Sequence, residues 1–328
     1  MESERLTRIL TQGDADERKA ALLAVQDEPE PQHLGPALVA LDDVDPTVRR
    51  LGVRIVESLG DPRAAASLVV LLGDHDPGVA GEALRALCSL RGAAVRGELA
   101  RALWSTSRTC RSGALLALRE QVDDQALPGL LHCLSDADAE VRRAALCLIA
   151  RLRRPELASV LYAPLDDASP EVRRVALAAF LQLDPARAYE PCIRALADAH
   201  WSVRREAVRG LGTLGVGATA AALTEALDDV AWEVQKEAAL ALGMLGGPAA
   251  HQALIQALDA AAPDVRKAAV HGLTLAASGT AHDPATHARL SVLSSDDLDA
   301  EVRKAAHAAL MPPGMPITGA SARSRTSA

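Results

Sequence analysis

The chain has 328 residues, of which 49% are hydrophobic and only 2% aromatic, and its formal net charge is −8 at pH 7. Aromatic side chains normally supply much of the buried area of a large globular core, so their scarcity favours thin packed layers over one thick core. The acidic balance excludes a strongly basic nucleic-acid binder as the default class.

The sequence carries no sign of export or of membrane insertion. No run approaches the roughly 20 consecutive apolar residues that span a bilayer, and the charged start MESERLTRIL lacks the apolar stretch of a secretory signal. The five cysteines are odd in number and contain no C-x-x-C pair, which speaks against a disulfide framework and against a thiolate zinc site. We therefore expect a cytoplasmic protein with no membrane association and no cofactor.

A register of 31 residues runs along the chain. The string Val-Arg-Arg, or a variant of it, begins at Val48, Val141, Val172, Val203, Val234 and Val265. Filling the gaps of the same register adds Glu17, Val79 and Cys110, and a tenth unit begins at Val302. The last interval is 37 residues, so one connection carries six extra residues. Missing such a repeat would misassign the whole fold.

Two further positions of the register have a fixed character. The residue four after each register point is small: Ala21, Gly52, Ala83, Ala114, Ala145, Ala176, Ala207, Ala238, Ala269 and Ala306. The residue eight after it is large and apolar: Val25, Val56, Leu87, Leu118, Ile149, Phe180, Leu211, Leu242, Leu273 and Leu310. Positions 0, 4 and 8 share one face of a helix, so each unit is predicted to bury one stripe whose small middle admits a neighbouring helix.

The start of this helix is marked in most units. N-cap residues are predicted at Asp14, Asp45, Asp76, Ser107, Asp138, Ser169 and Asp299. Prolines suited to the first helical position follow at Pro46, Pro77, Pro170 and Pro263. C-cap glycines are predicted at Gly60, Gly215 and Gly246. These signals place the cap in a short turn that follows an earlier helix.

That earlier helix is visible in apolar runs at 68–72, 130–134 and 221–227, and Pro31, Pro62, Pro155 and Pro248 mark the links between units. One helix pair cannot bury its own apolar face, so the units must stack. The prediction is an all-α, right-handed α-solenoid of about ten helix–turn–helix repeats over residues 1–311. Residues 312–328, rich in Pro, Gly, Ser and Arg, are expected to form a disordered tail.

The pattern D-x-x-x-x-V-R-x-x-A, carried by residues 43–50, 136–143, 167–174 and 198–205, resembles that of HEAT-repeat proteins. Since 31 residues is shorter than the roughly 40 of most HEAT units, the chain is most similar to the short-period HEAT-like class named after the phycobilin lyases. The resemblance implies an α-solenoid. Members of this class include scaffolds, lyase subunits and a few enzymes, so function must be argued from the site.

Asp five residues before the register point and Arg one residue after it recur along the chain. A cation at a helix N-terminus opposes the helix dipole, so each Arg needs a nearby carboxylate. We expect a structural ladder of charge-assisted Asp–Arg contacts that joins neighbouring repeats. Its members include Asp43, Arg49, Asp136, Arg142, Asp167, Arg173, Asp198 and Arg204. A catalytic carboxylate array is the alternative.

No motif for chemistry stands out. The chain has no His-Glu dipeptide, no G-x-S-x-G and no phosphate-binding glycine loop, and its nine His are scattered, so we predict no catalytic and no metal-binding residue. The cysteines, at positions of small apolar residues, are expected to be packed and inert: Cys88, Cys110, Cys133, Cys147 and Cys192.

A nucleic-acid interface is an alternative that rests on one stretch. Residues 85–154 contain twelve Arg and seven acidic residues, a local excess of positive charge in an acidic chain. The rings are too few for a base-stacking platform, however. An ordinary solvated face or an acidic protein partner is therefore the preferred explanation.

The favoured function is a non-enzymatic scaffold or adaptor that holds a protein partner on a concave second-helix surface. Candidate contacts six residues after their register points are Arg54, Arg85, Arg209 and His271. Further candidates are Trp104 and Arg108, in the unit that departs most from the pattern, and Trp201 and Trp232, in equivalent slots of adjacent units. The two equivalent rings either cover a neighbouring turn or anchor the partner. A bilin lyase or isomerase subunit is the alternative that the resemblance implies.

Overall fold

The computed structural model describes residues 2–277 and 283–311, and the predicted tail at 312–328 lies outside the described residues. All regular structure in the described residues is helical, which confirms the all-α solenoid class. The chain divides into two compact units, Met1–Leu183 and Asp184–Ala328.

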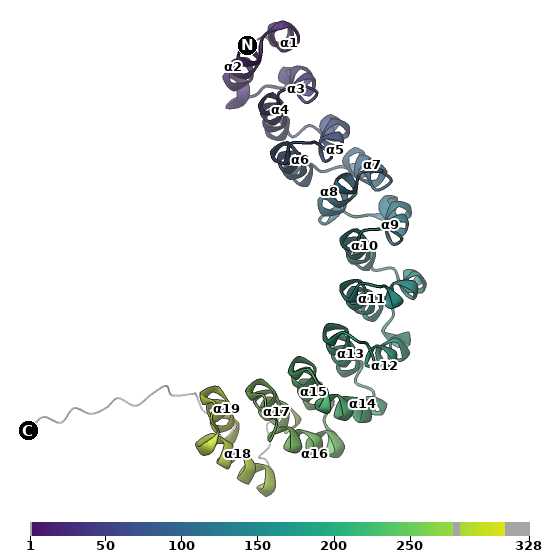
Figure 1. The fold of residues 1–328 in the computed structure, drawn as a ribbon, viewed down its shortest axis with the longest axis vertical. Coiled ribbons are helices and arrows are strands. Elements are labelled where there is room, and N and C mark those ends of the chain that lie inside the picture. Colours follow the sequence, from purple (N-terminus) through teal and green to yellow (C-terminus); the bar gives the residue numbers. More distant parts are fainter. Residues whose placement is uncertain (1, 278–282, 312–328) are drawn as a thin grey trace, which may run out of the picture. The chain divides into compact units, whose positions relative to one another are not determined.

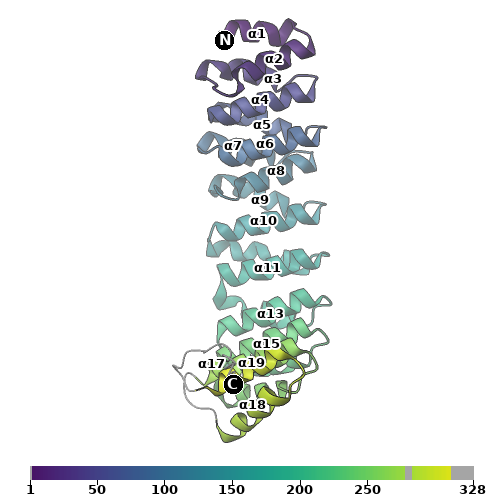
Figure 2. The same cartoon turned by 90° about the vertical axis from the view of Figure 1, so that its left-hand side faces the viewer.

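The first unit is a double layer of helices (Figures 1 and 2). The first helices of its repeats are α1 (Ser3–Gln12), α3 (Leu34–Ala40), α5 (Ala65–Leu71), α7 (Ala93–Ala102) and α9 (Leu127–Cys133). The second helices are α2 (Ala15–Gln26), α4 (Pro46–Leu59), α6 (Pro77–Ser89), α8 (Arg108–Leu118), α10 (Ala139–Arg151) and α11 (Pro170–Leu183). Short 3₁₀ turns precede several first helices: η1 (Pro31–His33), η2 (Pro62–Ala64) and η3 (Asp124–Ala126).

The second unit repeats the same design. Its first helices are α12 (Tyr189–Ala195), α14 (Ala220–Glu225), α16 (Gly247–Ala257) and α18 (Pro284–Asp296). Its second helices are α13 (Trp201–Leu214), α15 (Trp232–Leu245), α17 (Pro263–Ala276) and α19 (Ala300–Leu310). The 3₁₀ turns of this unit are η6 (Pro185–Arg187), η7 (Gly217–Thr219) and η8 (Ala226–Asp228). Each second helix packs against its own first helix and against the second helix of the next repeat.

The ends of the second helices follow the predicted capping chemistry. Asp138 accepts hydrogen bonds from the backbone nitrogens of Glu140 at 2.9 Å and Val141 at 3.2 Å, which satisfies two donors at the start of α10. Gly60 and Gly215 end α4 and α13 with φ of 63°, the left-handed conformation that glycine adopts without a steric penalty. Local sequence therefore sets where these helices begin and end.

The core is built from the two predicted register positions. All ten small residues four after the register points are buried, and so are nine of the ten large residues eight after them. Leu310, in the last described helix, is only partly buried. Small side chains let the helices approach, and the large ones fill the space between the layers.

One repeat departs from the predicted helix pair. Its first helix is replaced by two 3₁₀ segments, η4 (Pro155–Leu161) and η5 (Ala163–Asp166). The prediction of an α-helix here is wrong because Pro164 has no backbone N–H to donate and its ring blocks a continuous α-helix. Phe180 packs in this repeat with its ring edge-on to Tyr162, at 5.0 Å between centroids and 71° between planes.

Helices α15 and α17 of the second unit approach each other closely at two glycines. A Cβ atom added to Gly243 would overlap the Cα atom of Gly272, and one added to Gly272 would lie 2.8 Å from the carbonyl oxygen of Ala239. Neither backbone can move without disturbing the helix pair, so these two positions require glycine.

Replacement of Gly243 by Ala is expected to lower the free energy of unfolding by about 2 kcal/mol, because the added methyl group overpacks a backbone contact. Gly217→Ala is the control in the same unit, since nothing lies within 4 Å of its added Cβ atom. Urea unfolding followed by circular dichroism measures both variants. Equal midpoints for the two would show that α15 and α17 do not touch in this way.

Candidate functional site

The turns between paired helices are joined by arginine side chains that contact two repeats at once. Arg142 donates Nε and Nη2 to the two carboxylate oxygens of Asp167, each at 2.7 Å. Its Nη1 donates to the backbone oxygens of Asp136 at 2.8 Å and Ala137 at 3.1 Å in its own turn. Asp167 also accepts from the backbone nitrogen of Ser169 at 2.8 Å. One guanidinium thus braces its own turn and pairs with the Asp of the next repeat.

The same arrangement recurs in both units. The equivalent bidentate pairs are Arg49 with Asp74, Arg111 with Asp136, Arg204 with Asp229 and Arg266 with Asp297. In each pair the Asp lies 25 residues after the Arg in the sequence. Arg266 is the exception, because the six-residue insertion makes this separation 31 residues. The contacts cross from one repeat to the next, as charge-assisted staples do.

The remaining ladder residues take part in the same turns. The carbonyl oxygen of Asp43 accepts from Arg49 Nη1 at 2.7 Å, and its carboxylate accepts from Arg18. Arg173 Nη1 donates to the carbonyl oxygen of Asp167 at 2.8 Å. Asp198 accepts from the backbone nitrogen of the residue two positions later at 2.8 Å and, through its carbonyl, from Arg204 at 2.9 Å.

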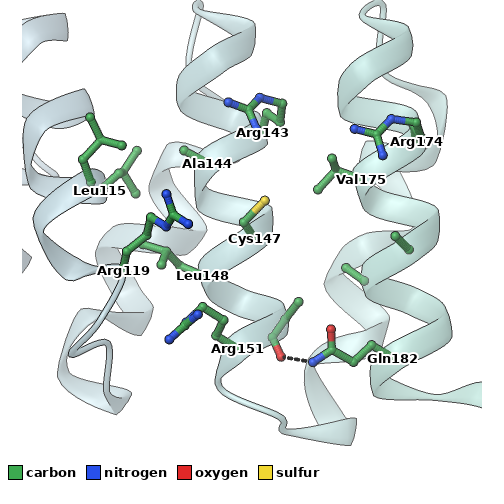
Figure 3. A pocket seen from close by; sticks show the side chains of 14 residues that line it. Leu115, Arg119, Arg143, Ala144, Cys147, Leu148, Arg151, Arg174, Val175 and Gln182 are labelled. Atoms are coloured by element: carbon green, nitrogen blue, oxygen red, sulfur yellow. Dashed lines mark hydrogen bonds between the residues drawn. The ribbon is translucent and has the colours of Figure 1, made fainter. Parts of the chain in front are cut away.

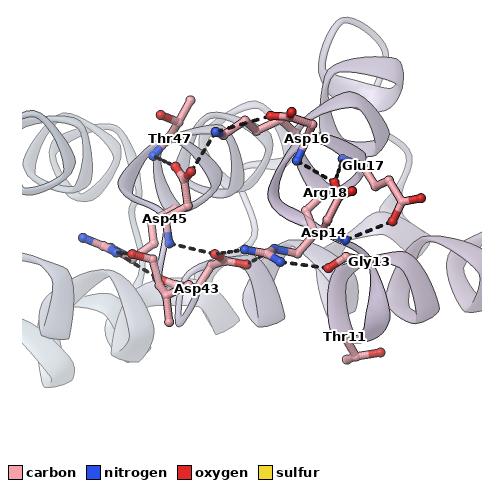
Figure 4. A network of polar contacts seen from close by, with 12 residues as sticks. Thr11, Gly13, Asp14, Asp16, Glu17, Arg18, Asp43, Asp45 and Thr47 are labelled. Carbon is pink, nitrogen blue, oxygen red and sulfur yellow. Dashed lines mark hydrogen bonds and ion pairs between the residues drawn. The ribbon is translucent and has the colours of Figure 1, made fainter.

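Figure 4 shows the first rung of the ladder. Arg18 Nη2 donates to Asp43 at 3.0 Å, and its Nη1 donates to the carbonyl oxygen of Gly13 at 2.9 Å. Beside it, Lys19 lies 2.7 Å from Asp45. The hydrogen bond from Lys19 is the main reason why the pKa of Asp45 falls to about 2. Arg18 and Lys19 therefore each hold a carboxylate of the next repeat.

The four predicted polar contacts six residues after the register points have different surroundings. Arg54 donates to Glu82 at 2.9 Å, and Arg50 donates to the same oxygen at 2.9 Å. Glu82 is only 5% exposed, so these two cations neutralise a buried carboxylate. Their contacts are structural.

The other three predicted contacts are Arg85 on α6, Arg209 on α13 and His271 on α17. Arg209 pairs with the buried Glu206 of its own helix, so it too has a structural partner. Arg85 and His271 are exposed, and neither forms an ion pair with a residue in the described part of the chain. The structure therefore does not bring the four predicted contacts together into one polar site.

Two of the tryptophans lie against a cation on their own helix. The guanidinium of Arg205 lies 5.1 Å from the ring centroid of Trp201, and the Nζ atom of Lys236 lies 5.7 Å from that of Trp232. Trp201 also stacks on His200, with 5.8 Å between ring centroids. Trp232 remains 42% exposed. Each contact joins residues four apart or fewer, so the rings repeat a local arrangement.

The third tryptophan lies in the first unit, just after α7. Trp104 stacks on His132 with 4.4 Å between ring centroids and 14° between planes, and it is 55% exposed. Arg108, at the start of α8, forms an ion pair with Asp138 at 2.6 Å. This pair joins one repeat to the next outside the ladder.

The prediction of packed cysteines is correct for three residues and wrong for Cys147. Cys110, Cys133 and Cys192 are buried, and burial raises the pKa of Cys133 to about 11 and that of Cys192 to about 12. Cys88 is half-buried. Cys147 is exposed because it occupies the outward position six after its register point, where four other repeats carry long polar side chains.

Cys147 lies at the centre of a groove of about 520 Å³ that crosses α8, α10 and α11 (Figure 3). We name it the arginine groove after the four guanidinium groups on its sides. Its lining is Leu115, Leu116, Arg119, Arg143, Ala144, Cys147, Leu148, Ala150, Arg151, Arg174, Val175, Ala178, Ala179 and Gln182. A second hollow of about 350 Å³, between α6 and α8, shares Leu116 with it, so the depression continues toward the N-terminal repeats.

The groove exists because three consecutive repeats have short or apolar side chains six residues after the register point. These residues are Leu116, Cys147 and Ala178, where four other repeats have Arg54, Arg85, Arg209 and His271. The remaining residues at this position, Leu23, Leu240 and Ala308, are apolar too, but no two of them lie in consecutive repeats. The floor is therefore apolar and open, and Leu116 is 47% exposed. Gln182 closes one end, where its side chain donates to the carbonyl oxygen of Ala150 at 3.1 Å.

The cations around the groove are only lightly neutralised. Arg143 and Arg174 each pair with the Glu three residues earlier on the same helix, at 2.7 and 2.9 Å. Arg151 lies 3.9 Å from Glu120, and Arg119 forms no ion pair with any residue that the structure describes. Exposed pairs of this kind contribute little, so their guanidinium groups can accept a new carboxylate at low cost.

The candidate residues derived from sequence do not include the four arginines of the groove. The relevant pattern was present: the residue two after the register point is basic in eight of ten repeats, namely Lys19, Arg50, Arg143, Arg174, Arg205, Lys236, Lys267 and Lys304. Of the twelve arginines in the basic stretch, Arg119, Arg143 and Arg151 converge on the groove, whereas Arg111 and Arg142 belong to the ladder.

Among the described helices, none has the length and apolar character that crossing a lipid bilayer requires. In the part of the chain that the structure describes, no group of three or more His, Cys, Asp or Glu could hold a metal ion. The arginine groove is the candidate functional site.

A family model described as HEAT repeats matches residues 32–119, 70–150, 158–232, 189–274 and 220–311, which together exceed half of the chain. No curated protein matches the chain.

Several solved structures are similar in fold. The karyopherin Kap121p, in a structure bound to the extreme C-terminus of the protein phosphatase Cdc14p, is 16% identical with a TM-score of 0.61, over 94% of this chain and 41% of that chain. Kap95p, in a structure that concerns RanGDP, is 14% identical with a TM-score of 0.54, over 94% and 54%. The Escherichia coli protein YibA is 18% identical with a TM-score of 0.51, over 79% and 97%. This chain spans about half the length of the karyopherins, and identities this low show the fold alone.

Replacement of Arg142 by Ala is expected to lower the free energy of unfolding by about 2–4 kcal/mol, because it leaves a mostly buried Asp167 without its cation. The neighbouring variant Arg143→Ala is the control, since its pair with Glu140 is exposed and its loss changes stability by about 0.5 kcal/mol or less. Urea midpoints measure both. Equal losses for the two variants would contradict a joining role of the ladder.

The ladder also predicts how stability depends on pH. Hydrogen bonds from Arg142 and from the backbone nitrogen of Ser169 hold the pKa of Asp167 below its ordinary value, although burial opposes them. An unfolded Asp titrates near about 3.9, so this stabilisation is complete above about pH 4 and is lost as the pH falls through the lower folded-state pKa. In Asp167→Asn, urea midpoints measured from about pH 7 down to about pH 2 should fall less steeply in acid than in the native chain. An unchanged acid slope would contradict the assignment.

Proposed function

The chain belongs to the HEAT-repeat family, and we propose that it is a non-enzymatic scaffold or adaptor that binds a protein partner on the second helices of its first unit. Solved structures of similar fold include Kap121p bound to a segment of another protein. That likeness concerns the fold alone, so the proposal depends on the surface of this chain.

The observation that carries the proposal is the arginine groove. Its floor exposes apolar side chains across three consecutive repeats, and no other described segment of the first unit covers it. A hollow apolar surface with polar sides is typical of interaction sites. Leu116 belongs to both hollows and is the most exposed large apolar side chain of the floor, which makes it the natural anchor for a partner.

A bilin lyase or isomerase subunit is the second candidate, and it rests on the finer resemblance to the short-period class. The groove bears on it because bilins carry carboxylates that guanidinium groups recognise. A change in the visible absorbance of a bilin on mixing with the chain, lost in Arg143→Gln, would favour this candidate. An unchanged spectrum would exclude it.

Leu116→Glu is expected to reduce capture of the partner by about tenfold or more, because it places a charge on the apolar floor. Leu23→Glu is the matched control: Leu23 occupies the same register position on α2, is 55% exposed and lies outside the groove. Affinity capture with each form, followed by quantitative mass spectrometry, measures the effect.

A protein that is retained by the native chain and by Leu23→Glu, and lost with Leu116→Glu, supports the proposal. Two results contradict it: equal capture by all three forms, and recovery of no protein by the native chain.

A further inference from the structure

The arginine groove has two rows of cations along an apolar floor. Arg143 and Arg174 lie two residues after their register points, near the start of α10 and α11. Arg119 and Arg151 lie at the other ends of α8 and α10 (Figure 3). Eight residues separate Arg143 from Arg151, which corresponds to about 12 Å along a helix. A space of this width accommodates one chain segment between the rows.

We infer that the arginine groove holds an acidic, amphipathic segment of a protein partner, with its carboxylates at the guanidinium groups and its apolar side chains on the floor. This inference rests on the proposed scaffold function and specifies the chemistry of the partner.

The donor capacity of the arginines supports an acidic occupant. Arg143 donates Nε and Nη2 to one oxygen of Glu140, at 3.0 and 2.7 Å, and Arg174 does the same with Glu171, at 3.1 and 2.9 Å. A guanidinium has five N–H donors, so each retains three for a carboxylate from outside. Arg119 has all its donors available to the partner, since no described residue pairs with it.

The length of the groove sets the size of the segment. The three helices belong to consecutive repeats, and packed helix axes lie roughly 8–10 Å apart, so the groove spans about 20 Å. An extended chain covers this length with about six residues, at about 3.3 Å per residue. Arg143 and Arg174 occupy equivalent slots of adjacent repeats. In an extended segment of the polyproline II type, residues three positions apart share one face at a spacing of about 9 Å, so acidic residues three apart reach both arginines.

The composition of the floor favours a protein over a nucleic acid. No aromatic ring lines the arginine groove, so it offers bases no stacking surface. A phosphodiester backbone would leave the exposed side chain of Leu116 unburied, whereas an amphipathic peptide buries it.

Cys147 provides a probe inside the groove. It is exposed and lies between the two rows, whereas Cys110, Cys133 and Cys192 are buried. Iodoacetamide is uncharged, so its reaction with Cys147, read on the corresponding proteolytic fragment by mass spectrometry, reports occupancy of the groove. The measured quantity is the ratio of the alkylation rate without peptide to the rate with peptide. This ratio corrects for any difference in the reactivity of the Cys147 thiol between variants.

The probe ligand is a synthetic peptide of about twelve residues, with Glu at every third position and Leu and Ser between. The comparison peptide has Gln in place of Glu. The Glu peptide should protect Cys147 saturably, with a dissociation constant about tenfold lower than that of the Gln peptide. The double variant Arg143→Gln, Arg174→Gln should lose about tenfold in affinity. The control Arg63→Gln, Arg101→Gln removes two exposed cations outside the groove, and it should bind within about twofold of the native chain.

Equal protection by the two peptides would overturn the inference, and so would full binding of the Glu peptide by the double variant of the groove. Stronger protection by a single-stranded oligonucleotide of the same length would overturn it in favour of a nucleic acid. If Leu116→Glu abolishes partner capture while the Glu peptide gives no protection, the scaffold function stands and the acidic chemistry fails. If Leu116→Glu leaves partner capture unchanged and the Glu peptide gives no protection, the scaffold function and the acidic chemistry of the partner both fail.

Discussion

The guanidinium group of each ladder arginine binds two neighbouring repeats at once, and the rest of the structure depends on this interaction. One edge of the guanidinium holds the carbonyl groups of its own turn, and the other pairs with an Asp that shapes the next turn. The repeats without this arginine support the same interpretation. Ala80 and Gln235 replace it, and the positions 25 residues later are Ser105 and Ala260 instead of Asp. Cation and carboxylate are lost together, as expected if neither is tolerated alone at a half-buried turn.

The six-residue insertion before the last repeat shows that the ladder pair does not depend on a fixed spacing in the sequence. Arg266 still pairs with Asp297 through two hydrogen bonds, at 2.7 and 2.8 Å, although the partner is now 31 residues ahead. The contact is therefore preserved although the chain between the two residues is six residues longer than in the other repeats. With the turns and the buried stripe joining the repeats, the outward face of the second helices is free to vary from repeat to repeat. The arginine groove is one product of that freedom, since Leu116, Cys147 and Ala178 lie on this face.

Most of the fold could be predicted from the sequence because its determinants recur at fixed positions. Ala145 and Ile149 lie in the core as the register indicates, and Asp138 caps its helix as expected. The prediction failed at Pro164, where a single residue overrides the repeat. The groove could not be predicted from any one position. It requires short or apolar side chains in three successive repeats and cations contributed by neighbouring helices, and only the stacked structure shows that Arg119, Arg143 and Arg174 converge. The exposure of Cys147 depends on the same neighbours.

Hydrogen–deuterium exchange on the full chain, with and without its captured partner, tests the central claim most directly. Backbone amides report contact along every helix without any substitution, although they respond to local opening as well as to coverage. If the groove is the binding surface, exchange should slow in α8, α10 and α11, with the largest change around Leu116 and Cys147. Slowed exchange confined to the first helices or to the second unit, with α8, α10 and α11 unchanged, would contradict it.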